Sequence, residues 1–82
     1  MMIRVLFFAS LKEQLGTPNV EMETTASRVD ELLQQLIEQN PRWKPHLQQG
    51  TLLCAVNQQL CDTEHPLAVG DEVAFFPPVT GG

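Results

Sequence analysis

Basic residues are scarce in this sequence, which has five Lys and Arg against ten Asp and Glu and a formal net charge of -5. No part of it forms a basic stripe, and phosphate repulsion opposes the binding of an acidic chain to nucleic acid. We therefore expect no nucleic-acid partner. A basic protein partner fits this charge better.

Long hydrophobic runs are also missing. No apolar segment approaches the ~20 residues that a membrane-spanning helix needs, so no membrane association is expected. The apolar stretch 1–9 is short and lacks both a charged n-region and a small-residue cleavage site, which a signal peptide would carry. The expected location is cytoplasmic.

Only two cysteines are present, Cys54 and Cys61, too few for a disulfide framework. A hairpin with its turn at Asn57-Gln58 would place them opposite each other on neighbouring strands. They are then either a redox-sensitive pair or two small buried hydrophobic residues in a reducing compartment. We favour the second interpretation.

A complete catalytic site is not found either. The sequence has no Ser-His-Asp order, no P-loop and no glycine-rich phosphate loop. His46 and His65 are isolated from each other and from the cysteines, so we place them in polar loops and expect no metal site. The chain is not expected to be an enzyme on its own or to hold a stable cofactor.

What is present is enough for one small globular domain of 82 residues, 43% of them hydrophobic. Apolar residues at helical spacing predict one main helix, which Asn40-Pro41 ends. Ser27, with Asp30 three residues later, matches a capping box at its start. The residues expected on its core face are Val29, Leu32, Leu33, Leu36 and Ile37.

Alternating and β-branched segments predict five strands around this helix. We expect the order β-β-α-β-β-β, because residues 10–16 look like a short helical or turn segment and residues 41–50 look irregular or form a single helical turn, with Trp43 over an edge of the core. One helix covers one face of a mixed sheet, so the fold class is a small α+β roll with its first and last strands paired centrally. The strands are expected at residues 3–9, 20–24, 52–56, 59–61 and 72–76.

Strand alternation leaves aromatic side chains on the uncovered face of this sheet. Phe8 and Phe76 lie there beside Leu6 and Ala74, and Leu60 from the hairpin extends the patch. A contiguous exposed apolar area usually marks a binding surface. The alternative is that loops fold over this face, and we favour the partner site.

Gly81-Gly82 closes the sequence directly after Phe-Phe-Pro-Pro-Val-Thr at residues 75–80. Glycine has no Cβ and lets a partner's backbone approach closely, and a terminal carboxylate becomes reactive once a second enzyme adenylates it. Extended, residues 77–82 reach roughly 20 Å at ~3.3–3.6 Å per residue. Pro77-Pro78 would lower the entropy lost when this tail docks. From the dipeptide alone, an inert terminus explains the sequence equally well.

Three segments resemble the family of sulfur-carrier subunits of molybdopterin synthase. They are Ile-Arg-Val-Leu-Phe-Phe-Ala at 3–9, Ala-Val-Asn-Gln at 55–58 and, above all, Gly-Asp-Glu-Val-Ala-Phe-Phe-Pro-Pro-Val-Thr-Gly-Gly at 70–82. The resemblance covers essentially the whole chain, although residues 17–50 match mainly in pattern. It implies a β-grasp, ubiquitin-like fold, with the domain at 1–76 and a flexible tail at 77–82.

The resemblance also implies a reaction cycle in molybdenum cofactor biosynthesis. An E1-like enzyme would use ATP to adenylate the Gly82 carboxylate, and a sulfur donor protein would convert it to a thiocarboxylate. The carrier would dock on the large synthase subunit in a heterotetramer, with Gly81 and Gly82 threaded into a narrow channel, and pass sulfur to cyclic pyranopterin monophosphate to form the dithiolene. The positions that match the family's partner-binding residues are Phe8, Leu60, Phe76, Pro77, Pro78, Val79 and Thr80.

Other functions share these features. A sister sulfur carrier for thiazole synthesis or another thiolation pathway would have the same fold and Gly-Gly ending, and so would a ubiquitin-like protein modifier. A non-covalent interaction domain with an inert tail is a further alternative. The segment at 75–80 favours the molybdenum pathway.

Overall fold

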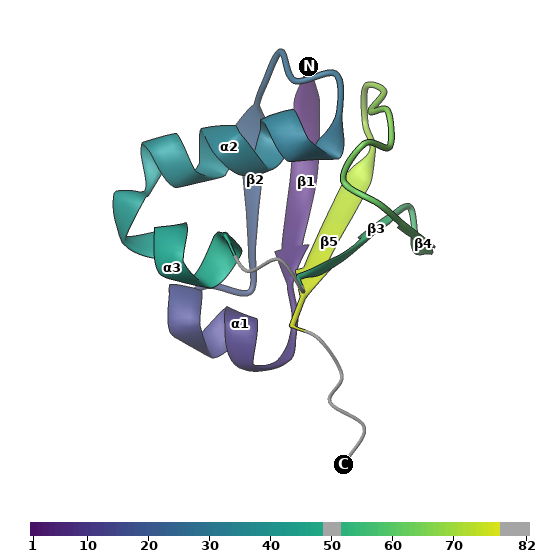
Figure 1. Ribbon diagram of the computed structural model, residues 1–82. Coiled ribbons are helices and arrows are strands. Elements are labelled where there is room, and N and C mark those ends of the chain that lie inside the picture. The colour runs from purple at the N-terminus through teal and green to yellow at the C-terminus, as the bar shows by residue number, and fades with distance from the viewer. Residues whose placement is uncertain (49–51, 78–82) are drawn as a thin grey trace.

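The computed structural model describes residues 1–48 and 52–77, and in them a mixed sheet carries helices on one side (Figure 1). The strands are β1 (Met2–Phe7), β2 (Asn19–Glu23), β3 (Leu53–Val56), β4 (Gln59–Cys61) and β5 (Glu72–Phe76). The helices are α1 (Ala9–Leu15), α2 (Val29–Gln39), the 3-10 helix η1 (Pro41–Trp43) and α3 (Lys44–Leu47).

The five strands lie in the order β2-β1-β5-β3-β4. The first and last strands, β1 and β5, are parallel neighbours at the centre, with Val5 opposite Val73. Antiparallel strands flank them on both sides. The α+β roll with a central pair of first and last strands is therefore confirmed, and this arrangement is that of a β-grasp fold.

The core lies between the sheet and the helices. Phe7 of β1 and Phe75 of β5 are buried there with stacked rings whose centroids are 6.5 Å apart. Trp43 meets Phe7 edge-on at 5.4 Å and is partly buried, as expected for a side chain over an edge of the core. The core face of α2 is confirmed, because Val29, Leu32, Leu36 and Ile37 are buried and Leu33 is partly buried against them.

The structure contains more helices than the expected order of elements. Residues 9–15 form a regular helix, α1, which ends at Gly16 in the left-handed conformation with φ 77°. Leu11 and Leu15 of α1 and Leu47 of α3 are buried in the core. Of the two alternatives for residues 10–16, the helix is therefore correct, and the expected order was wrong in leaving out α1, η1 and α3. Two apolar residues four apart are too few to separate a short helix from a turn, and tertiary packing stabilises it.

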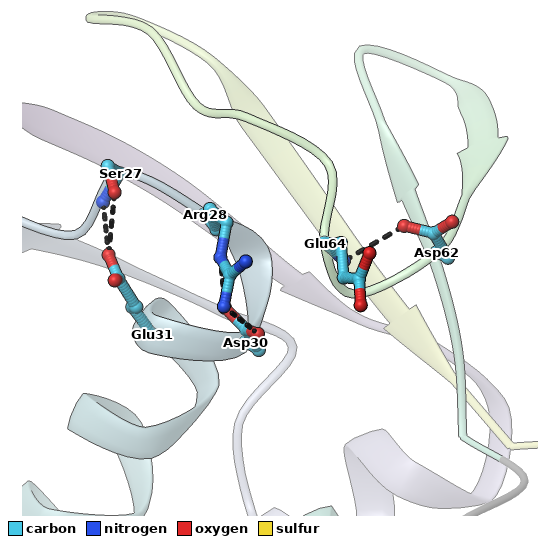
Figure 2. Close-up of polar contacts among 6 residues, drawn as sticks. All are labelled: Ser27, Arg28, Asp30, Glu31, Asp62 and Glu64. Atoms are coloured by element: carbon cyan, nitrogen blue, oxygen red, sulfur yellow. Dashed lines mark hydrogen bonds and ion pairs between the residues drawn. The ribbon is translucent and has the colours of Figure 1, made fainter.

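The start of α2 also differs from the predicted capping box. The carboxylate of Glu31, not Asp30, accepts hydrogen bonds from the backbone N–H of Ser27 at 2.7 Å and from its hydroxyl at 2.8 Å (Figure 2). Asp30 instead forms an ion pair with Arg28 at 2.8 Å. Arg28 holds the extended N-cap position, and its side chain makes no capping bond.

Backbone carbonyls from a distant loop cap this helix end. The N–H of Val29 donates to the carbonyl of His65 at 3.1 Å, and the N–H of Asp30 donates to the carbonyl of Thr63 at 2.7 Å. The loop is tightened by the bond from the Glu64 N–H to Asp62 Oδ1 at 2.9 Å (Figure 2). Two of the N–H groups that an isolated helix leaves unpaired are satisfied in this way. Within the described ranges, no helix is long and apolar enough to cross a membrane.

Candidate functional site

The face of the sheet opposite the helices carries a shallow apolar groove of about 510 Å³. Because successive side chains of a strand point to opposite faces, burying Val73 and Phe75 turns Ala74 and Phe76 outward. The apolar side chains that line this outer groove are Leu6, Phe8, Ala55, Leu60, Ala74 and Phe76.

The three aromatic and aliphatic residues expected to bind a partner line this one groove. Phe8 lies just past the end of β1, so the strand is shorter than the predicted 3–9, and Ala9 begins α1 with a positive φ of 55°. Phe8 is 49% exposed and Leu60 is 74% exposed. The described loops therefore leave this face open, and the alternative in which loops cover it is wrong for the described residues. The partner-binding role of Phe8, Leu60 and Phe76 stays a prediction.

The β3–β4 hairpin forms one wall of the groove. Its turn residues Asn57 and Gln58 both have left-handed conformations, with φ of 50° and 70°, as a tight two-residue hairpin turn requires. The turn is joined to β5, since the Asn57 N–H donates to the Glu72 carbonyl at 2.8 Å. Leu60, on the edge strand β4, lies opposite Ala55 of β3 and is thereby held on the groove one strand away from β5.

Sequence reasoning missed two polar residues at the rim of the groove, Gln58 and Glu72. The signal for Glu72 was available, because it shares the outward parity of Ala74 and Phe76. Its position at the rim depends on the pairing register of β5 with β1, and the sequence alone does not reveal that register.

The groove ends where β5 ends. Pro77 follows Phe76 directly and lacks the N–H that would continue the ladder. The expected site residues Pro78, Val79, Thr80, Gly81 and Gly82 lie outside the described residues. The domain boundary at residue 76 and the tail at 77–82 stay predictions.

The two cysteines are opposite each other across β3 and β4, as predicted, with their sulfur atoms 3.8 Å apart. Both are free thiols. Burial, with a smaller contribution from Cys61, raises the pKa of the Cys54 thiol to about 12. The thiolate is the reactive form, so Cys54 is a weak nucleophile at neutral pH. Its parity places it on the core side of the sheet, away from the outer groove.

The two histidines and the acidic residues that the structure describes do not form a metal or catalytic site. In residues 1–48 and 52–77, no group of three His, Cys, Asp or Glu side chains is placed to hold a metal ion. His46 lies within α3 and not in a polar loop as expected. His65 lies in the loop before Pro66, and its backbone carbonyl accepts a hydrogen bond from the first residue of α2, Val29. The geometry offers an open apolar groove and a strand end, and the described part of the chain contains no assembled catalytic group.

A parallel central strand pair, helices on one face and an open apolar groove on the other define a ubiquitin-like β-grasp protein. The chain belongs to the ThiS family, whose model matches residues 5–82. It is 52% identical to the molybdopterin synthase sulfur carrier subunit of Escherichia coli, over 99% of this chain and 100% of that protein. The subunit of the same name from Haemophilus influenzae is 40% identical over the same shares.

Solved structures agree with this assignment. SAMP1 from Haloferax volcanii superposes with a TM-score of 0.85 at 25% identity, covering 100% of both chains. The complex of subunits 1 and 2 of molybdopterin-converting factor from Helicobacter pylori contains a chain with a TM-score of 0.69 at 30% identity, again covering 100% of both chains. The ubiquitin-like β-grasp fold is confirmed by these likenesses.

Proposed function

We propose that this chain is the sulfur-carrier subunit of a molybdopterin synthase. One observation carries the proposal. Phe76 lines the outer groove, and the segment 77–82, which ends in Gly81-Gly82, follows Phe76 directly in the sequence. A partner that covers Phe8, Leu60 and Phe76 would receive that segment at the edge of its own contact surface. The 52% identity to the Escherichia coli sulfur carrier subunit supports the same function.

The proposed chemistry occurs at the carboxylate of Gly82. An E1-like enzyme joins one carboxylate oxygen to the α-phosphate of ATP and releases pyrophosphate. Sulfide from a donor protein then attacks the acyl carbon, displaces AMP and leaves a thiocarboxylate. This group is ionised and softer than a carboxylate, so it is a better nucleophile toward carbon. Gly81 and Gly82 contribute small size and backbone freedom in the partner's channel.

The large subunit of the synthase is the proposed acceptor. It would dock on the outer groove, supply the catalytic groups and direct sulfur from Gly82 to cyclic pyranopterin monophosphate, and two such transfers would build one dithiolene. The expected assembly is a heterotetramer with a large-subunit dimer at its centre. The E1-like enzyme would use the same groove, so the two partners would bind in turn. The cytoplasmic location stays a prediction.

Reconstitution tests this proposal. The thiocarboxylate form of the full chain is mixed with the large subunit and cyclic pyranopterin monophosphate, and molybdopterin is measured together with the carrier returned to its carboxylate form. We expect two carriers to be consumed for each molybdopterin formed. A carrier that keeps its sulfur in this mixture, yet delivers it to a thiazole-forming system, would be a sister carrier. The unloaded chain is the control.

Protein modification is the second candidate function, because the chain resembles SAMP1, a small archaeal modifier protein. A modifier ends in an isopeptide bond between its terminal carboxyl group and a lysine. Incubation with the E1-like enzyme, ATP and a host extract is followed by cleavage after glutamate and by mass spectrometry for lysines that carry residues 73–82 of this chain, which separates the two functions. A sulfur carrier leaves no such lysines.

A further inference from the structure

A second hollow adjoins the outer groove on the same face of the sheet. It encloses about 350 Å³ and lies beside Arg4, Glu21 and Glu72. Glu72 also lines the apolar groove. The two hollows therefore meet at Glu72, with the apolar groove on the side of Phe76 and the charged hollow on the side of Arg4.

The charges at this end do not balance. In the sheet register, Arg4 lies opposite Glu21 on β2 and opposite Glu72 on β5. Its guanidinium group pairs with Glu21 at 3.2 Å. Within the described part of the chain, the Glu72 carboxylate has no hydrogen bond or ion pair. Among the described residues, Glu72 thus remains at the rim of an apolar groove without a salt bridge, because the guanidinium of its neighbour Arg4 is paired with Glu21.

The Lys and Arg side chains that have no ion pair among the described residues lie elsewhere. Lys12, Arg42 and Lys44 belong to α1, η1 and α3, which pack on the other face of the sheet (Figure 1). A partner seated on the outer face does not meet them. It meets Glu72 together with the apolar side chains of the groove.

We propose that the partner in the groove places an arginine or lysine side chain against Glu72. This inference rests on the proposed function and takes the large subunit as the partner. Glu72 is half-buried before docking, and further desolvation of an unpaired carboxylate is unfavourable unless a cation or hydrogen-bond donor meets it. A basic group on the partner satisfies this requirement and agrees with the acidic net charge.

The contact would give the docked carrier a direction. Glu72 and Phe76 are the first and last residues of β5, so their positions are separated by roughly 13 Å along the strand. An ionic contact at one end and an apolar contact at the other cannot be exchanged by turning the carrier around. Electrostatic complementarity commonly fixes register and orientation in this way. The segment after Phe76 is then directed into the partner and not away from it.

The test compares charge changes on the two faces. Glu72→Lys and Glu72→Gln are measured against Glu38→Lys and Glu38→Gln, since Glu38 is exposed on α2 and, among the described residues, its side chain accepts one hydrogen bond, from Gln34 at 3.4 Å. Each pair changes the net charge equally. The dissociation constant of the full chain and the large subunit is measured by calorimetry at low and high salt. We expect Glu72→Gln to weaken binding roughly fivefold and Glu72→Lys roughly fiftyfold, with the Glu38 variants within about twofold of wild type at low salt.

Control measurements separate loss of the Glu72 contact from unfolding and from a general effect of net charge. A lysine at position 72 would face Arg4, so the melting temperature is recorded for every variant, and the uncharged Glu72→Gln decides the question if Glu72→Lys unfolds. Equal weakening by the Glu72 and Glu38 variants would show a net-charge effect and overturn the inference. Wild-type affinity in Glu72→Gln would overturn it as well, while leaving the proposed function in place. No binding of wild-type chain to the large subunit would overturn both.

Discussion

Asn57 donates a hydrogen bond from Nδ2 to Oδ1 of Asp71 at 3.0 Å, which joins the β3–β4 turn to the residue just before β5. The same amide accepts a bond from the Glu72 N–H at 3.1 Å. Asp71 also accepts from the Ala68 N–H at 2.8 Å, so it holds the loop that leads into β5. One side-chain amide therefore fixes the hairpin wall of the outer groove to the strand that carries Glu72 and Phe76.

Replacing Asn57 by glycine tests this link. Glycine keeps the left-handed turn, whose φ is 50°, but removes both amide bonds. We expect the free energy of unfolding to fall by about 1–2 kcal/mol and large-subunit binding to weaken severalfold as the hairpin loosens. Urea unfolding and calorimetry measure the two effects.

Gln58→Gly is the matched control for stability, because Gln58 has a φ of 70° in the same turn. A glycine there relieves a positive φ and removes no bond to β5, so stability should stay unchanged or rise slightly. Equal losses of stability in the two variants would contradict the role assigned to the Asn57 amide.

Phe75 and Phe76 are neighbours on β5 with opposite roles. Phe75 is fully buried, and its replacement by alanine should destabilise the chain by about 3–5 kcal/mol. Phe76 faces the groove and is half-buried, so Phe76→Ala should lower stability far less and weaken binding to the large subunit far more. Thermal unfolding and a binding titration on both variants measure this contrast. A stability loss from Phe76→Ala that matches the Phe75→Ala loss would make Phe76 a core residue.

The proposed chemistry requires the carboxylate to be on Gly82. Adding one residue after Gly82 should abolish sulfur loading by the E1-like enzyme, while the melting temperature stays at its wild-type value, because the addition is well separated along the chain from Phe75, the last buried core residue described. Loading is followed by intact mass. An extended chain that still gains sulfur would contradict the mechanism.

The buried thiol of Cys54 makes stability depend on pH. Its pKa is raised in the folded state from an ordinary value of 9.0 to about 12, so in that interval the folded chain holds a proton that the unfolded chain has released. This contribution to stability is fully present below pH 9.0 and is lost as the pH rises toward 12. Urea unfolding at several pH values should show a steeper loss for wild type than for Cys54→Ala. An equal loss of unfolding free energy with pH in wild type and Cys54→Ala would show that the thiol does not contribute to the pH dependence of stability.

Much of the outer face could be predicted from alternation alone. A strand has a period of two, so the buried Ile3, Val5 and Phe7 determine that Leu6 points outward, and the same rule places Ala74 and Phe76 on the groove. The hairpin turn at Asn57-Gln58 then brings Leu60 to the same face. These inferences needed only local pattern and one assumption, that the first and last strands pair.

The errors came from interactions between distant segments. Ser27 has acidic residues both three and four positions later, and the sequence does not show that Glu31 is the one that accepts its hydrogen bonds. It also does not show that the backbone carbonyls of Thr63 and His65 cap α2. The hydrogen-bond links of Asn57 and the rim position of Glu72 depend on strand register, which local sequence does not specify.

The intact mass of the full chain after incubation with the E1-like enzyme, ATP and a sulfide source tests the central claim most directly. We expect a gain in mass equal to the replacement of one oxygen by sulfur, located at Gly82 by fragmentation. An unchanged mass, with the enzyme shown to be active on another carrier, would contradict it and leave a binding domain whose Gly-Gly ending takes no part in chemistry.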